Sequence, residues 1–280
     1  MIFAKMKSNI ALRVFRRFNY SVLRKIAGKM EYQILFEELY SSALQGMNIG
    51  SGTNTDSSGE AETLNYIKQR LDGQDNLIVF DVGANVGNYS LMLKDILGEN
   101  AMIFSFEPSK KTFERLHSNL NNTSNIKLFN FGFGAQDSKL NLYSDADESG
   151  LASIYHRRLD HFGIEMNKTE EIDIKTIDGF CEENRLGHIH FLKLDVEGHE
   201  INVLKGASKT LSSGMVDYIQ FEFGGSNIDS RTYFQDFYYL LKDNYKIYRI
   251  VKDGLRKIEG YKEMHESFIT TNYLSERKNL

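Results

Sequence analysis

Hydrophobic and polar positions follow two alternating patterns along most of the chain. Short apolar runs, rich in β-branched and aromatic side chains, are typical of strands that are buried on both faces of a sheet. These runs are NLIVFDV (76–82), AMIFSFEP (101–108), IKLFNFG (126–132), HIHFLKLDV (188–196) and VDYIQFEFG (216–224). Stretches with helical spacing lie between or beside them, at 62–71, 88–97, 110–120 and 200–211. Strands that alternate with helices predict a parallel sheet with right-handed crossovers.

The C-terminal part departs from this alternation. After a less regular stretch, TIDGFCEEN (176–184) predicts a short helix, and TYFQDFYYLLKD (232–243) predicts a longer one. YKIYRIV (245–251) and ESFITTNYL (266–274) then follow each other with no helix between them. We therefore expect the sheet to end in an antiparallel strand.

The first forty residues have a helical pattern of their own. One face carries Ala11, Val14, Phe15, Phe18, Val22 and Ile26, and Arg13, Arg17 and Arg24 lie opposite. Three interpretations remain open: a helix packed on the catalytic domain, an amphipathic helix on an anionic membrane surface, or a mitochondrial transit peptide. A polar loop at 48–60 indicates a boundary, with an extension at 1–55 and a catalytic domain at 56–280.

Composition narrows the class of protein. A chain of 280 residues fits one domain of roughly 200 residues plus an extension, and no apolar run approaches the ~20 residues of a membrane span. The single Cys181 excludes an internal disulfide framework, so the cytoplasm is the expected location, with a membrane-peripheral position as the alternative. Residues 1–30 hold eight Lys or Arg and no acid. The remainder has 26 basic and 38 acidic residues, which gives a formal net charge of −12, and is not expected to bind nucleic acid.

The first strand ends in a glycine turn, DVGANVGN (81–88), which predicts a pocket where a ligand meets backbone N–H groups. Glu107 ends the next strand, where an acid accepts hydrogen bonds from ribose hydroxyls. A dinucleotide requires G-x-G-x-x-G, but Asn85 and Asn88 occupy the second and third glycine positions counted from Gly83. S-adenosylmethionine has no pyrophosphate and does not require those glycines. An NAD-linked oxidoreductase is therefore disfavoured.

A second group of polar residues follows the strand at 188–196, in FLKLDVEGHE. Asp195 ends this strand and Glu222 lies at the end of the next, so the two carboxylates are expected about 4.8 Å apart across the sheet. Such a pair can accept the proton of a hydroxyl or hold a hard cation such as Mg²⁺, and the sequence does not choose between these roles. Glu200 is interpreted as a helix cap. The sequence does not decide whether Glu197 and His199 have structural or chemical roles, and His199 is a candidate base.

Five motifs in this order resemble the FkbM-type methyltransferases: DVGANVGNYS, FEPSKKTFERLHSN, TIDGF, FLKLDVEGHEINVLKGA and QFEF. The resemblance covers roughly residues 62–275. It implies the class I methyltransferase Rossmann-like fold, an α/β fold with a seven-stranded, mostly parallel sheet and an antiparallel last strand. It also implies an S-adenosylmethionine-dependent O-methyltransferase that modifies hydroxyls of sugars or polyketide-like products.

The resemblance further implies a set of cofactor contacts. The methionine end would meet Gly83, Asn85 and Gly87, within the turn from Asp81 to Asn88. Glu107 would hold the ribose, Pro108 and Ser109 the adenine edge, and Phe131 and Gly132 the base. Ser153, in GLASIYHR (150–157), is a further candidate. Asp195 would face the substrate.

The resulting hypothesis is an S-adenosylmethionine-dependent O-methyltransferase that acts on a hydroxyl of a saccharide or glycan. The alternative within the same class is a polyketide-like or other small-molecule hydroxyl. A non-catalytic cofactor-binding protein is less favoured. The expected partners are the acceptor molecule and, through residues 1–30, a membrane surface.

Overall fold

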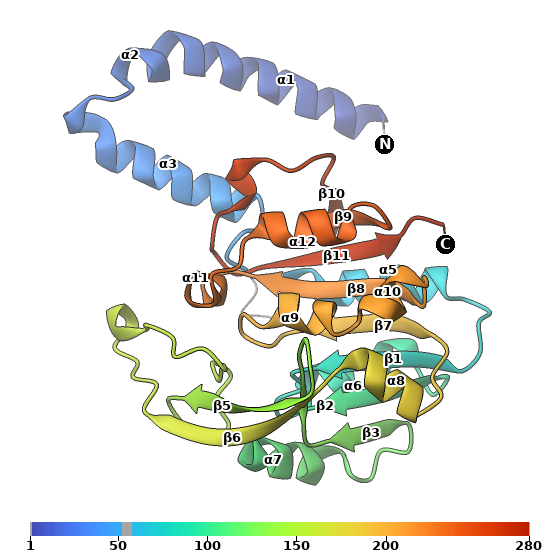
Figure 1. Ribbon diagram of the computed structural model, residues 1–280. Coiled ribbons are helices and arrows are strands. Elements are labelled where there is room, and N and C mark those ends of the chain that lie inside the picture. The colour runs from blue at the N-terminus through green and yellow to red at the C-terminus, as the bar shows by residue number, and fades with distance from the viewer. Residues whose placement is uncertain (1, 52–57, 280) are drawn as a thin grey trace. The chain divides into compact units, whose positions relative to one another are not determined.

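The computed structural model describes residues 2–51 and 58–279 and forms two compact units, Met1–Met47 and Asn48–Leu280. The predicted boundary between residues 55 and 56 lies outside the described residues. The first unit is helical (Figure 1). It consists of α1 (Ile2–Phe18), the π-helical segment η1 (Asn19–Leu23), α2 (Arg24–Ile26), the 3₁₀ turn η2 (Met30–Tyr32) and α3 (Gln33–Gly46).

An eight-stranded sheet forms the centre of the second unit, in the order β10-β9-β11-β8-β7-β1-β2-β3. The strands are β1 (Leu77–Val82), β2 (Ala101–Phe106), β3 (Ile126–Phe129), β7 (Ile189–Leu194), β8 (Val216–Phe223), β9 (Tyr245–Val251), β10 (Gly254–Lys257) and β11 (Thr271–Arg277). β11 is antiparallel to both β8 and β9, while β1, β2, β3, β7 and β8 pair in parallel. The predicted mostly parallel sheet with an antiparallel last strand is confirmed. β10 adds an eighth strand because the two-residue turn Lys252-Asp253 sends the chain back along β9.

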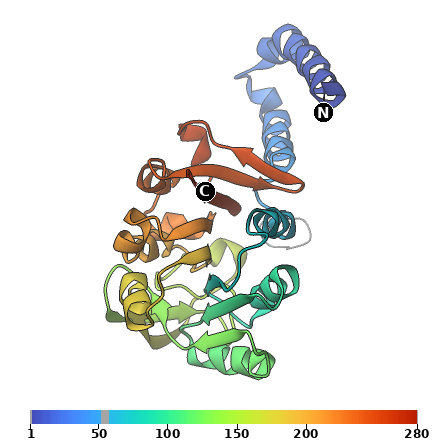
Figure 2. The ribbon, with the colours of Figure 1, turned by 90° about the vertical axis from the view of Figure 1, so that its right-hand side faces the viewer.

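Helices cover both faces of this sheet (Figure 2). α5 (Glu60–Arg70), α6 (Asn88–Leu97) and α7 (Lys110–Leu120) pack on one face. The other face is covered by α8 (Ile177–Glu183), α9 (Glu200–Lys205), α10 (Ser208–Ser212) and α12 (Phe234–Leu241), and α11 (Ser226–Ser230) follows β8. The single helix predicted at 200–211 is in fact two, α9 and α10. The chain bends between them where Gly206 lies directly against the carbonyl of Gly134.

The less regular stretch of the sequence contains a second sheet, in the order β4-β6-β5. Its strands are β4 (Gly132–Phe133), β5 (Ser138–Ser144) and β6 (Lys168–Lys175), and the 3₁₀ turn η3 (Asp160–Phe162) lies in the connection from β5 to β6. A last 3₁₀ turn, η4 (Glu263–His265), precedes β11. The side chains of Leu142, Ile172 and Ile174 form a small apolar cluster on one face of this sheet. This face therefore offers an apolar wall beside the main sheet.

The turn after β1 lies in direct contact with the end of β7. Gly83 has φ +82°, and a Cβ there would collide with the carbonyl oxygen of Asp195. The amide of Asp195 donates to the carbonyl of Val82 (3.0 Å), and the amide of Gly83 donates to the carbonyl of Phe106 (3.0 Å). Only glycine satisfies both the left-handed conformation and the missing space.

We predict that Gly83→Ala lowers the free energy of unfolding by roughly 2–5 kcal/mol, because a left-handed residue and an overpacked contact are added together. Urea denaturation of the full chain measures this change.

Gly163 provides the matched control. It is also left-handed (φ 69°, ψ 24°), but a Cβ there would meet nothing within 4 Å. Gly163→Ala should therefore cost only about 1–2 kcal/mol. Equal losses in the two variants would mean that the Asp195 carbonyl imposes no constraint of its own.

Candidate functional site

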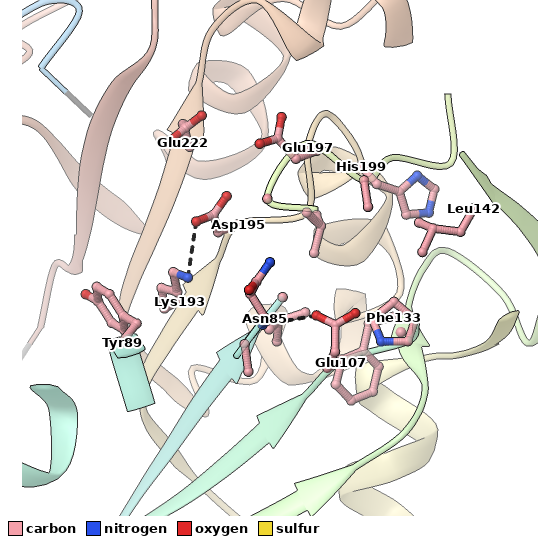
Figure 3. Close-up of a pocket in the computed structure, with 18 of the residues that line it drawn as sticks. Asn85, Tyr89, Glu107, Phe133, Leu142, Lys193, Asp195, Glu197, His199 and Glu222 are labelled. Atoms are coloured by element: carbon pink, nitrogen blue, oxygen red, sulfur yellow. Dashed lines mark hydrogen bonds and ion pairs between the residues drawn. The ribbon is translucent and has the colours of Figure 1, made fainter. Parts of the chain in front are cut away.

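A pocket of about 430 Å³ lies at the carboxyl ends of β1, β2, β7 and β8, where α/β sheets bind ligands. Its volume is in the range of small-molecule sites. Nine residues predicted from the sequence line it: Gly83, Asn85, Asn88, Glu107, Pro108, Gly132, Asp195, His199 and Glu222. Figure 3 shows Tyr89 and Lys193 on one side, Leu142, Phe133 and His199 on the other, and Asn85 and Glu107 between them.

Glu107 occupies the middle of the pocket. Its Oε2 accepts the amide N–H of Asn85 (3.0 Å) and its Oε1 accepts that of Ser109 (2.9 Å). Burial raises the pKa of the Glu107 carboxyl to about 7, against the opposing effect of the two N–H donors. Glu107 therefore holds the glycine turn in place and still has lone pairs for a ligand hydroxyl.

Two predicted cofactor residues, Asp81 and Gly87, support the glycine turn from outside the pocket lining. Asp81 is fully buried, accepts the Ser90 hydroxyl (2.6 Å) and lies 3.4 Å from Lys193 Nζ. Gly87 is left-handed (φ 97°) and precedes α6, where a Cβ would strike the side chain of Leu120.

Three further predicted residues also lie outside the pocket lining. The Ser109 hydroxyl donates to Glu170 (2.9 Å), and Phe131 packs among the aromatic rings of the core. The Ser153 hydroxyl donates to the backbone carbonyl of Glu197 (2.7 Å). Ser153 thus connects the loop after β5 to the segment after β7.

Sequence reasoning missed the apolar end of the pocket. The second sheet contributes Phe133, Leu142, Ile172 and Ile174, and the neighbouring Ile154 completes this part of the lining. The signal was present as a short period-two alternation, Leu140 and Leu142 in KLNLYS and Ile172 and Ile174 in EEIDIK. This end of the pocket suits a flat, apolar ring.

The opposite end is acidic. Carboxylate oxygens of Asp195, Glu197 and Glu222 lie within 4.8 Å of one another. Burial, followed by the charges of Asp195 and Glu197, raises the pKa of Glu222 well above its ordinary value. Burial also raises the pKa of Glu197, although Arg157 Nη1 lies 2.6 Å from its Oε2 and opposes the rise.

Lys193 is a buried cation beneath these acids, and sequence reasoning missed it. Its Nζ lies 3.3 Å from Asp195 Oδ2, 3.4 Å from Asp81 Oδ1 and 4.6 Å from the centre of the Tyr89 ring. Burial lowers the pKa of the Lys193 ammonium, but the carboxylates of Asp195, Asp81 and Glu60 outweigh this effect and raise it. A lysine inside a buried parallel strand was the available sequence signal.

His199 is packed rather than solvated. Its Nδ1 lies 3.2 Å from the Tyr155 hydroxyl and 3.1 Å from Asn202 Nδ2. Burial, with a smaller contribution from Lys205, lowers the pKa of His199 to about 4, so the ring is neutral at pH 7. A neutral imidazole at the pocket wall can still exchange a proton, which keeps His199 a candidate base.

Glu200 closes the loop between β7 and α9. Its Oε1 accepts the amide N–H groups of Val196 and Gly198, both at 3.1 Å. The side chain is buried below this loop. These two bonds connect the Glu200 side chain to the loop before α9, and Glu200 is not part of the pocket lining.

The model of the methyltransferase FkbM domain matches residues 81–248, which is more than half of the chain. The hexuronic acid methyltransferase AglP of Haloferax volcanii is 27% identical over 55% of this chain and 59% of its own length. The 2-O-methyltransferase NoeI of Sinorhizobium fredii is 22% identical over 51% of this chain and 63% of its own. The chain thus spans about three fifths of the length of these curated relatives. The FkbM match runs from the glycine turn to β9 and includes both acidic strand ends, and the chain belongs to the FkbM methyltransferase family.

Proposed function

We propose that the protein is an S-adenosylmethionine-dependent O-methyltransferase that methylates a hydroxyl of a saccharide or glycan. One observation carries this proposal: a single pocket contains an apolar wall, the buried acid Glu107 and the carboxylate of Asp195, in that order. The names of the two relatives, a hexuronic acid methyltransferase and a 2-O-methyltransferase, support a sugar acceptor.

The pocket fits the methyl donor from end to end. The face formed by Leu142, Ile172 and Ile174 takes the adenine, and Glu107 accepts hydrogen bonds from the ribose hydroxyls. The methionine part then extends past Gly83 towards the acidic end. When bound, the cofactor supplies an electrophilic methyl group on a positively charged sulfur.

Asp195 serves the acceptor. An alcohol is a poor nucleophile because its pKa lies near that of water, ~15.7, so the site must align its oxygen and receive its proton. The Asp195 side chain is 40% exposed, and only its Oδ2 is paired with Lys193. Its carboxylate is therefore the acid best placed to orient the hydroxyl and accept the proton.

An Mg²⁺ ion shared by Asp195 and Glu222 is the alternative means of activating the hydroxyl. The ammonium of Lys193, 3.3 Å from Asp195 Oδ2, would repel a second cation and so favours direct proton acceptance. A polyketide-like or other small-molecule hydroxyl is the alternative acceptor.

Residues 1–30 support a second proposal, contact with an anionic membrane surface. The segment contains eight basic residues and no acid, and the apolar side chains of Ile10 (58% exposed), Val14 (63%), Phe15 and Phe18 are exposed. Among residues 2–51 and 58–279, no helix has the length and apolar character to cross a bilayer. The helix would therefore lie in the interface.

The ribose assignment predicts that Glu107→Ala weakens S-adenosylmethionine binding by about one to two orders of magnitude, the effect of losing a charge-assisted hydrogen bond. Isothermal calorimetry measures the affinity, and thermal unfolding checks that the fold is kept. Glu170→Ala, which removes a nearby carboxylate outside the pocket lining, should leave the affinity unchanged. Unchanged affinity in Glu107→Ala would place the ribose elsewhere.

The acceptor assignment predicts that Asp195→Asn lowers turnover by about 10²–10⁴, because the amide keeps the shape but cannot take the proton. Transfer of a labelled methyl group to a panel of glycosides measures turnover, and cofactor affinity should change little. Near-normal turnover would reduce Asp195 to a structural role and leave His199 as the next candidate base.

A chelator separates the two means of activation. Direct proton acceptance predicts no effect of the chelator on the parent enzyme. If an ion is required, the chelator should abolish transfer, and Glu222→Gln should show the same defect.

The membrane proposal predicts that replacing Arg13, Arg16 and Arg17 together by Gln weakens binding to vesicles containing phosphatidylserine. Each arginine contributes roughly 1 kcal/mol near such a surface, so the affinity should fall about a hundredfold. Cosedimentation with vesicles measures this loss.

The matched control replaces the exposed Lys68, Lys127 and Lys139 of the second unit by Gln, which removes the same charge and should leave vesicle binding unchanged. Equal binding of all three proteins, or equal binding to neutral phosphatidylcholine vesicles, would contradict the proposal.

A further inference from the structure

Glu60 is a buried carboxylate in the pocket wall that the catalytic proposal does not use. It is the first residue of α5, is 6% exposed and lines the pocket. Its Oε1 accepts the Gln220 amide (2.7 Å), and its Oε2 accepts the Ser58 hydroxyl (2.9 Å). Among the described residues no cation lies within ion-pair distance of it, and burial raises the pKa of its carboxyl. A buried acid of this kind is a candidate to receive a cation from a ligand.

The backbone holds Glu60 in one position. Gly59 before it has φ +87°, and a Cβ there would collide with the carbonyl oxygen of Val251 on β9. On the other side, Gln220 accepts the Tyr89 hydroxyl (2.9 Å) with its Oε1. This bond fixes the amide so that its NH₂ group donates to Glu60. The carboxylate is thus held in place before any ligand binds.

The order of groups in the pocket decides which part of the cofactor reaches Glu60. With adenine on the apolar wall and ribose at Glu107, the methionine part must extend to the side of Tyr89 and Lys193 (Figure 3). Glu60 lies in the lining with those two residues and hydrogen-bonds through Gln220 to Tyr89.

The negative charge of Glu60 determines which group of the methionine moiety can lie beside it. The one lysine in the described lining, Lys193, is already held by Asp81 and Asp195. A carboxylate arriving beside Glu60 would be repelled, whereas an ammonium would neutralise it and donate to a remaining lone pair of its oxygens.

We propose that Glu60 binds the α-ammonium group of the cofactor's methionine moiety. The proposal rests on the proposed function, since it requires S-adenosylmethionine in this pocket. It makes Glu60 a determinant of cofactor specificity, because it distinguishes a nucleoside that carries an amino acid from one that does not.

A purely structural role for Glu60 predicts something different. If Glu60 only supports Gln220 and Tyr89, its loss distorts the pocket for every ligand alike. A direct contact affects only ligands that carry the amino group. Two probes separate these cases: S-adenosylhomocysteine, and 5′-methylthioadenosine, which has the same adenine, ribose and thioether but no amino acid.

The experiment compares calorimetric affinities of the full chain and of Glu60→Gln, which keeps the side chain's size and its ability to accept from Gln220. We expect S-adenosylhomocysteine to bind about 10- to 100-fold more weakly to the variant, the effect of losing a charge-assisted hydrogen bond. The affinity for 5′-methylthioadenosine should change by less than about threefold. Glu62→Gln, an exposed acid of the same helix, should bind both probes like the parent.

Three outcomes overturn the proposal. Equal loss for both probes would make Glu60 a structural support, and unchanged affinity for both would remove it from the ligand. Failure of S-adenosylhomocysteine to bind the parent chain would instead reject the proposed function, and with it this contact. If Glu60→Gln does not fold, Glu60→Asp keeps the charge and withdraws it by one methylene. It should then lower the preference for S-adenosylhomocysteine over 5′-methylthioadenosine, and an unchanged preference would contradict the assignment.

Discussion

The contact between the turn after β1 and the end of β7 is the constraint on which the rest of the site depends. The backbone of Gly83 lies against the Asp195 carbonyl, so the ends of the two strands can come together only where the turn has no side chain. This approach brings the glycine turn and Asp195 to the same edge of the sheet. Ion pairs between side chains also join the two strand ends, since Lys193 pairs with Asp81 on β1 and with Asp195 after β7.

Buried charge is concentrated at this edge. Asp195, Glu197 and Glu222 meet within 4.8 Å, and Lys193 and Arg157 are the cations paired with acids there. Burial therefore costs free energy that the fold must supply elsewhere. The two apolar cores on the faces of the sheet, rich in Phe, Leu and Ile, provide that stability. The site is thus an acidic edge held by a well-packed sheet, an arrangement common where groups must be ready for chemistry.

Much of the fold could be predicted from the sequence because local patterns specify it. The helix 88–97 appears with the predicted bounds, as Asn88–Leu97, because a glycine with positive φ precedes it and another follows it. The helix predicted at 200–211 was too long because the contact of Gly206 with Gly134 joins residues far apart in sequence. The same distinction holds for the residues of the candidate site. Glu107 and Asp195 could be identified from the sequence because each ends a strand, whereas Glu60 and Lys193 reach the pocket only through tertiary packing. The second sheet had its alternation, but no neighbouring helix marked it as part of the fold.

The position of β11 has a consequence for how the chain acquires its structure. This strand lies between β8 and β9 and is antiparallel to both, yet it follows them in the chain. As the polypeptide leaves the ribosome, β8 and β9 are therefore made with a gap between them, and each presents an unpaired edge. The half of the sheet that carries Glu222 closes only after residues 271–277 emerge. Until then the nascent chain exposes two strand edges with unpaired backbone N–H and C=O groups. In this interval chaperones would protect it from aggregation.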